Sequence, residues 1–343
     1  MANLTRAHHE LFRRSEDERF SSLAELHEHC LREKQQSQDR WQQPQFFDPR
    51  ISGDTVQLAL GQDSGEFSLN HWSFSQLCGL CGVSKDTLNQ LSPATANQAI
   101  RETLPSGTKP LQVLTTGQTV RSIHGVAYSR LWNADLLSML REYAVDFQPP
   151  PNGFNGATGL YCGEQDLFCF LIDPAGWTEI GGQAFAPGFF VWNSEVGRRS
   201  IGIQTFWFQK ICQNHIVWDA IEVMEFTRKH TGNVGESLTD IRRLIEQLVA
   251  KRAVRQEGFS KTIGKAMQER VVADGDEAAK LLFKQGIPRH LVKPAITLIA
   301  SQGKAFTLWT LVDALTQLTG KVCYAGDRTE ADIKVAQLLL LAV

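Results

Sequence analysis

Cys78 and Cys81 have the spacing of a Cys-x-x-Cys pair, which can bind zinc or carry out redox chemistry. Zinc needs four ligands, and neither a second Cys-x-x-Cys pair nor a His-x-x-x-His pair occurs in the sequence. Both cysteines fall in a predicted helix and turn, where small apolar side chains pack well. We therefore expect packing rather than metal or redox chemistry here, and no cofactor or metal for the chain.

A second group surrounds the predicted turn at 193–199. Two arginines stand at the end of this turn, and the return strand carries consecutive aromatic rings and then a lysine. Cations that follow the backbone, beside rings that stack on bases, are the features that bind single-stranded nucleic acid. A strand turns alternate side chains to opposite faces, so a core role for the rings stays open. The residues of this candidate site are Arg198, Arg199, Lys210, Phe206 and Trp207.

Arg121, His124, Tyr128 and Arg130 form a polar and aromatic group near the end of another predicted strand. We expect Arg121 and Arg130 to support the phosphate contacts. His124 would suit acid–base chemistry, but no nucleophile or carboxylate accompanies it at a defined spacing, which favours a structural role.

Charge restricts where nucleic acid could bind. The formal net charge is −2, so binding would need a local basic patch. Residues 225–270 contain ten Lys and Arg against six Asp and Glu. This excess could be a DNA-facing stripe or a solvated helix face, and the second interpretation is favoured.

Residues 74–91 resemble a helix-turn-helix unit, with Gly82 in the turn and Ser84 as the cap of the second helix. The second helix would present Lys85 and Asn89 but little positive charge, whereas phosphate binding needs more. A structural use of the two helices is therefore favoured over reading of duplex DNA.

Motifs for the common nucleotide and hydrolase sites are missing from the sequence. It contains no GxxxxGK[ST], GxGxxG, HExxH or GxSxG motif, which argues against ATP-driven chemistry and favours a binding protein over an enzyme. The odd number of cysteines, seven, and the absence of an apolar leader predict a cytoplasmic protein. The longest apolar stretch, 335–343, is too short to span a membrane.

The elements that position these residues alternate in kind along the chain. Hairpins are predicted over 111–124, 159–173 and 187–218, and helices over 21–33, 94–103 and 134–143. The fold class is α+β, with a central antiparallel sheet of hairpins flanked by helices and a helical C-terminal region. We expect an N-terminal helical or irregular extension (1–50), an α+β core (51–218) and a helical region (219–343). The helices predicted in the last region are 221–230, 234–257, 260–272, 276–285, 290–301, 307–318 and 329–341.

Three stretches together resemble the phage/plasmid-like DUF932 family, over about residues 55–343. They are GFFVWNSEVGRRSIGIQTFWFQKICQNHIVWDA, TVRSIHGVAYSRLWNADLL, and FTLWTLVDALTQLTG followed by DRTEADIKVAQLLL. The residues that match the family's central signature are Asn193, Ser194, Gly197, Lys210, Cys212 and Asn214. Lys210 stands where the family more often has arginine, which keeps the charge but loses the bidentate fork.

The resemblance implies a protein of DNA metabolism. The order of sheet and helices also resembles that of single-strand annealing proteins, which is an analogy at the level of the fold. We therefore expect ATP-independent binding of single-stranded DNA, with strand annealing as an added activity and a homo-oligomer as the assembly. The alternatives are a helix-turn-helix binder of duplex DNA and a protein–protein accessory or anti-defence factor.

Overall fold

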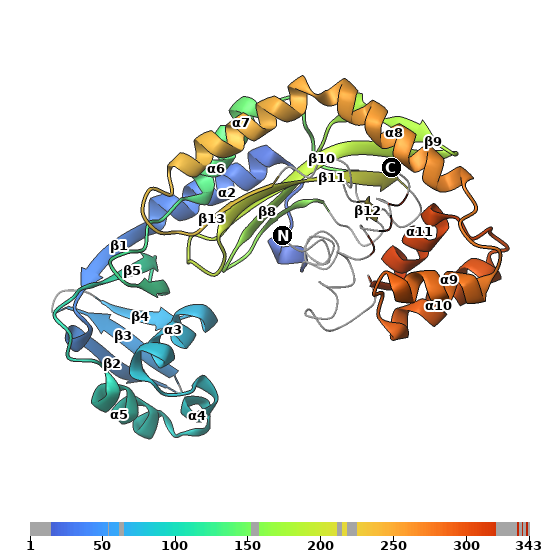
Figure 1. Cartoon of the computed structure of the whole chain (residues 1–343). Coiled ribbons are helices and arrows are strands. Elements are labelled where there is room, and N and C mark those ends of the chain that lie inside the picture. The colour runs from blue at the N-terminus through green and yellow to red at the C-terminus, as the bar shows by residue number, and fades with distance from the viewer. Residues whose placement is uncertain are drawn as a thin grey trace.

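The computed structural model describes residues 15–53, 55–61, 65–151, 158–210, 215–217 and 225–319, with residues 335, 338 and 341. The fold is α+β, as predicted, and consists of two mainly antiparallel sheets with helices packed against them. In Figure 1 the chain forms an arch, with the first sheet at one end and the last helices at the other. No helix in the described ranges has both the length and the apolar character needed to cross a bilayer.

The first sheet has the strand order β1-β5-β6-β4-β3-β2. Only the β4–β6 pairing is parallel among its described strands. Three helices cover it and bury a core that includes Leu58, Leu77 and Ile100. The strands are β1 (Ser37–Gln42), β2 (Phe47–Ser52), β3 (Thr55–Leu60), β4 (Glu66–Leu69), β5 (Leu111–Thr116) and β6 (Thr119–His124). The helices are α3 (His71–Cys81), α4 (Lys85–Gln90) and α5 (Pro93–Thr103).

The second sheet is built around one long hairpin. Its strand order is β12-β11-β10-β8-β7, with β13 paired to β11 and β9 paired to β10. The two central strands are mostly apolar and are buried along nearly their whole length, as expected for strands covered on both faces. The strands are β7 (Leu160–Cys162), β8 (Leu167–Ile172), β9 (Thr178–Ile180), β10 (Gln183–Asn193), β11 (Ile201–Lys210), β12 (His215–Val217) and β13 (Glu225–Arg228).

Helices α2 (Leu23–Gln36), α6 (Asn133–Tyr143) and α7 (Glu236–Ala250) pack on one face of the second sheet. Their apolar faces meet sheet residues such as Phe189 and Ile203 in a single core. Because α2 ends at Gln36 and β1 begins at Ser37, this helix joins the second sheet directly to the first (Figure 1). Alternate side chains of β8, β10 and β11 form a separate aromatic cluster with Tyr161 of β7.

The C-terminal helices form the other end of the arch. They are α8 (Arg252–Gln268), α9 (Gly275–Lys284), α10 (Arg289–Ser301) and α11 (Leu308–Thr319). Their core reaches back to the second sheet, where Phe259 of α8 packs against Phe185 and Trp207. The long helical run therefore rests on the central hairpin rather than standing apart from it.

Part of the segment predicted as an N-terminal extension belongs to the two sheets and their core. Within 1–50, α2 contributes Leu26 and Cys30 to the core, and β1 and β2 are strands of the first sheet. The helix predicted at 221–230 is wrong where it is described, because β13 pairs with β11 there. The helix predicted over 234–257 is interrupted at Lys251, and the one predicted at 329–341 lies almost entirely outside the described residues.

Candidate functional site

Glu195 is the centre of a buried polar network between the two sheets. It follows β10 and is only 2% exposed. Its Oε2 accepts a hydrogen bond from Arg121 Nη1 of β6 at 3.1 Å, and its Oε1 accepts one from the backbone N–H of Asn133 at 2.7 Å. One carboxylate thus joins the central hairpin, the first sheet and the start of α6.

Arg130 joins the same network from the loop before α6. Its guanidinium donates to both carboxylate oxygens of Asp39, at 3.2 and 2.7 Å, and also to the backbone carbonyl of Glu195. We call Asp39, Arg121, Arg130, Asn133 and Glu195 the Glu195 network. Its two arginine side chains are 7% and 3% exposed, so solvent reaches little of either guanidinium.

Charge and burial oppose each other in this network. Burial raises the pKa of the Glu195 carboxyl, whereas Arg121 and the Asn133 N–H act to lower it. Burial acts to lower the pKa of Arg121, but the carboxylates of Glu195 and Glu33 outweigh it and the pKa is raised. Arg121 and Glu195 thus stabilise each other's charge, and removing either one would lower the free energy of unfolding by leaving the other charge buried without its partner.

Three rings stack beside the network. The Tyr128 ring lies 3.7 Å from that of His124, centroid to centroid, and 5.6 Å from that of His230. Burial lowers the pKa of each histidine to about 4. Tyr128 donates a hydrogen bond to the Glu195 carbonyl at 2.7 Å. These histidines are therefore neutral at pH 7 and pack against Tyr128, the structural role predicted for His124.

The loop at 193–200 requires the small and polar residues that it carries. Asn193 donates to the Leu131 carbonyl at 2.9 Å, and Ser194 donates to the Gln165 carbonyl at 2.6 Å. Gly197 has φ +69°, and a Cβ there would lie 2.6 Å from His124 Cε1. Asn193, Ser194 and Gly197 therefore fix the backbone of this loop. Cys212 and Asn214, the other signature positions, lie outside the described residues.

The aromatic residues predicted to stack on bases are not at the surface. Phe206 and Trp207 are both 0% exposed. Trp207 stacks on Phe259 of α8 at a centroid distance of 3.8 Å, and Phe206 lies in the aromatic cluster on the opposite face of the sheet. Their expected exposure is wrong because both faces of β11 are buried, so alternation leaves neither ring in solvent.

The predicted basic residues are separated rather than gathered on one face. Arg121 and Arg130 are held in the Glu195 network. Arg199 forms an ion pair with Asp166 and lies over the Phe168 ring. Arg198 and Lys210 are exposed, but they stand at opposite ends of β11, and Arg198 lies over Trp72 of α3. The basic surface expected at this hairpin does not form.

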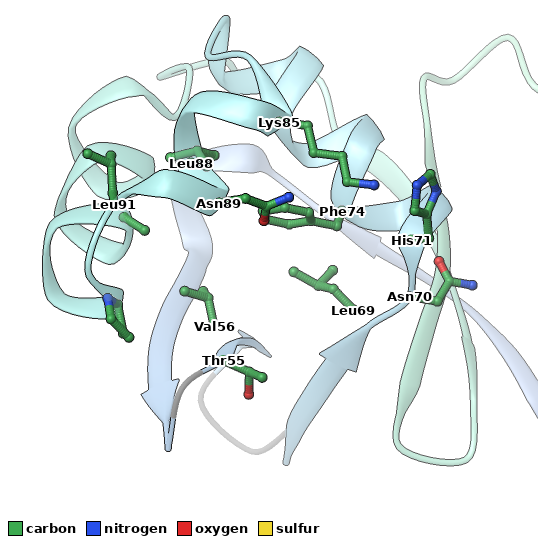
Figure 2. Close-up of a pocket in the computed structure, with 12 residues that line it drawn as sticks. Thr55, Val56, Leu69, Asn70, His71, Phe74, Lys85, Leu88, Asn89 and Leu91 are labelled. Atoms are coloured by element: carbon green, nitrogen blue, oxygen red, sulfur yellow. The ribbon is translucent and has the colours of Figure 1, made fainter.

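The two helices of 74–91 are present, and Ser84 caps α4 as predicted, accepting from Thr87 N–H at 3.1 Å. Helix α4 has only six residues, and its Lys85 and Asn89 line a pocket of about 550 Å³ between α3, α4 and the first sheet (Figure 2). Phe74 lies at the same pocket. The two side chains expected to contact DNA thus line a pocket, and a helix of six residues is short for reading a DNA groove. Cys78 and Cys81 are buried nearby and burial raises the pKa of each thiol, in agreement with packing.

A basic surface does occur at the junction of α9 and α10. The four exposed cations nearest this junction have no ion-pair partner in the described part of the chain, and Phe283 between them is 46% exposed. The Arg289 guanidinium lies over the Phe283 ring, 5.8 Å from its centroid, so the exposed faces of the two helices adjoin. We call this the α9–α10 basic surface; it consists of Lys280, Phe283, Lys284, Arg289 and Lys293.

A signal for this surface was present in the sequence. Residues 278–312 contain five Lys and Arg and no Asp or Glu. The net positive charge of 225–270 is less informative, because acidic residues are interspersed there and Arg228 and Arg242 form ion pairs. A count of unopposed cations, rather than of net charge, identifies α9 and α10.

No family model, no curated protein and no solved structure matches this chain. The resemblance to the phage/plasmid-like DUF932 family therefore stays a prediction.

Proposed function

We propose that this protein binds single-stranded DNA without ATP, through the α9–α10 basic surface. The observation that carries the proposal is an exposed aromatic ring beside the exposed Arg289, on two helices that carry three more exposed cations without a described carboxylate partner. Single strands are bound by cations along the backbone and by rings on which bases stack. This replaces the hairpin residues as the binding site and keeps the predicted class of ligand.

The helix geometry supports an anionic ligand at this surface. Arg289 is the first residue of α10, and no side chain caps the N-terminus of that helix. Free N–H groups and the helix dipole favour a phosphate there. The acidic residues of α9 lie in its first turn, at the opposite end from Lys284. Phosphate would therefore meet positive charge from both helices at the junction.

Other features restrict the kind of binding. The sequence lacks a phosphate-binding GxxxxGK[ST] loop, in accord with binding that needs no ATP. An exposed ring can stack on an unpaired base, whereas a base in a duplex presents only its edges. Strand annealing and a homo-oligomeric assembly are the finer parts of this proposal, and they rest on the analogy with annealing proteins.

The direct test is fluorescence anisotropy of a labelled oligothymidine with the full chain, without nucleotide, between about 50 and 200 mM salt. Proteins with larger phosphate-binding sites lose roughly 10³- to 10⁵-fold in affinity over this range. Four phosphate contacts to a single strand predict a slope of about −3 in a plot of log K against log salt. Affinity should then fall about 50-fold over this fourfold range of salt. Absence of binding at the lowest salt by folded, nucleic-acid-free protein would contradict the proposal.

A pair of charge reversals locates the site. Lys284→Glu with Lys293→Glu should abolish most of the binding, because both residues are exposed at the junction. Lys109→Glu with Lys229→Glu makes the same change in net charge at exposed positions elsewhere and should bind nearly as the unmodified protein does. Equal losses in both variants would mean that only total charge matters, and the assigned site would be wrong.

The two alternative functions predict different results in the binding assay and in the purification of the protein. Preference for a duplex competitor over the single strand would favour a binder of double-stranded DNA. A stoichiometric protein partner on purification, without DNA binding, would favour the protein–protein accessory factor. Phe283→Ala should weaken single-strand binding by about 5- to 150-fold if the ring stacks on one base.

A further inference from the structure

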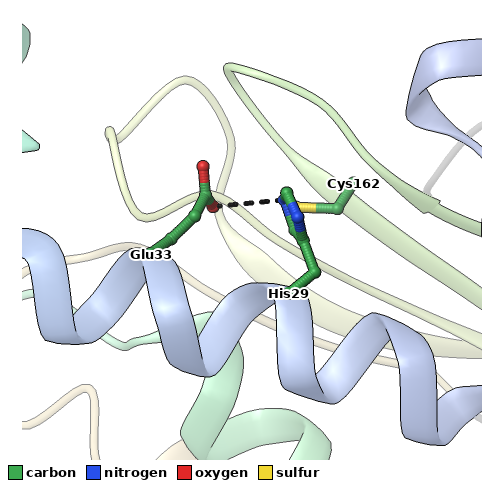
Figure 3. A group of neighbouring side chains, drawn as sticks. All are labelled: His29, Glu33 and Cys162. Carbon is green, nitrogen blue, oxygen red and sulfur yellow. Dashed lines mark ion pairs between the residues drawn. The ribbon is translucent and has the colours of Figure 1, made fainter.

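Three side chains with metal-binding atoms converge where α2 meets the edge of the second sheet. His29 and Glu33 are four residues apart on α2 and so share one face of the helix, while Cys162 is the last residue of β7. The ligand atoms of all three lie within 4.8 Å of one another. Figure 3 shows the imidazole of His29 between the Glu33 carboxylate and the Cys162 sulfur.

The separation of the His29 and Glu33 ligand atoms suits a tetrahedral metal. Zinc bonds to nitrogen, oxygen and sulfur are about 2.0–2.3 Å long, which places neighbouring ligand atoms about 3.3–3.7 Å apart in a tetrahedron. His29 Nε2 lies 3.7 Å from Glu33 Oε2. Imidazole, carboxylate and thiolate together form a mixed set of ligands that zinc accepts, whereas magnesium and calcium prefer oxygen alone.

Burial and unmet bonding capacity point to a ligand here. Glu33 Oε2 is buried and accepts no hydrogen bond from the described residues; the nearest basic nitrogens are His29 Nε2, at 3.7 Å, and Arg121 Nη1, at 3.8 Å. Cys162 is only 4% exposed, and its sulfur lies 3.8 Å from that of Cys30 and 3.9 Å from Asn133 Nδ2. The thiol also forms a hydrogen bond with the His29 imidazole, and a metal bound to both side chains would replace this contact. The side chains of His29 and Glu33 are about one-third exposed, at 35% and 27%, which leaves an entry path for an ion.

The surrounding charge also favours a cation. Glu33 connects through Arg121 to the Glu195 network. Two guanidiniums there, of Arg121 and Arg130, face three carboxylates, of Glu33, Asp39 and Glu195. His29 adds no charge in the neutral form that binds a metal, so one negative charge is left over. A divalent cation bound by a thiolate would add one net positive charge and neutralise the group.

We propose that His29 Nε2, Glu33 Oε2 and Cys162 Sγ bind one zinc ion, with water as the fourth ligand. The ion links residues 133 positions apart and fastens α2 to β7 beside the Glu195 network. Binding displaces the thiol proton of Cys162 to solvent, since the thiolate is the ligand. The site is independent of the α9–α10 basic surface.

The test uses the full chain, stripped with a chelator and titrated with zinc in competition with a chromophoric chelator. One equivalent should bind. Cobalt(II) in place of zinc should give the near-ultraviolet charge-transfer absorption of a thiolate ligand, together with tetrahedral visible bands. Binding of less than one equivalent, or cobalt spectra without the thiolate band, would overturn the assignment.

Matched variants identify the ligands. His29→Asn and Cys162→Ser should each weaken zinc binding by roughly 100-fold or more, above the 10- to 100-fold typical of residues that only support a ligand. His27→Asn, on the same helix but in contact with Ser138 and Arg141, should leave it unchanged. Because Cys162→Ser could unfold the buried site, the partly exposed His29 provides the decisive variant. Loss of binding in Cys78→Ser with Cys81→Ser, and not in His29→Asn, would refute the proposal.

Discussion

Glu195→Gln tests whether the buried network holds the two sheets together. The change keeps the shape of the side chain and leaves one oxygen to accept from the Asn133 N–H, but it places an amide where Arg121 now meets a carboxylate at 3.1 Å. Arg121 is then left with Glu33, at 3.8 Å, as its only described carboxylate. Breaking a buried ion pair costs about 3–5 kcal/mol, and the remaining partner places the expected cost near 3 kcal/mol.

The size of this effect should depend on the partner. Arg121→Met alone leaves Glu195 buried without its cation and should cost a similar amount. The double variant removes both charges, so its loss in unfolding free energy should be smaller than the sum of the two by about 2 kcal/mol. Urea unfolding followed by circular dichroism and tryptophan fluorescence measures all four proteins. A cost below about 1 kcal/mol for Glu195→Gln, or strict additivity, would refute the reasoning.

The remaining predictions concern the buried rings. Trp207→Ala should destabilise the fold by about 3–5 kcal/mol in thermal or urea unfolding, because it removes the ring stacked on Phe259. The DNA affinity of the folded variant should be unchanged. A selective loss of DNA binding would show that Trp207 contacts the ligand. His124 and His230 have folded-state pKa values of about 4, below the ordinary 6.5, so the unfolded chain binds more protons between these values and stability should fall as the pH drops from about 6.5 to about 4. Replacing both histidines with phenylalanine keeps the stack with Tyr128 and should flatten this pH dependence in unfolding experiments, and an equally steep curve would show that other groups cause it.

Much of the secondary structure follows from the sequence itself. The central hairpin is predicted because two long apolar runs flank a turn rich in polar residues and glycine, and β10 and β11 are indeed paired there. Helices α9, α10 and α11 begin and end within two residues of their predicted bounds, since apolar spacing and a Gly-Ile-Pro break near 286–288 are local signals. Local patterns also predict the α+β class, because they alternate between periods of two and of about 3.6.

The candidate sites, in contrast, were decided by contacts between distant parts of the chain. The alternation of β11 indicates that Phe206 and Trp207 face opposite ways, but only the packing of α8 on one side and the aromatic cluster on the other shows that both are buried. In the same way, Arg121 finds Glu195 from 74 positions away. Sequence determines which side chains carry charge or rings and on which element each lies. Tertiary structure decides whether those groups face solvent or a partner, because pairing and burial depend on neighbours that no local pattern specifies.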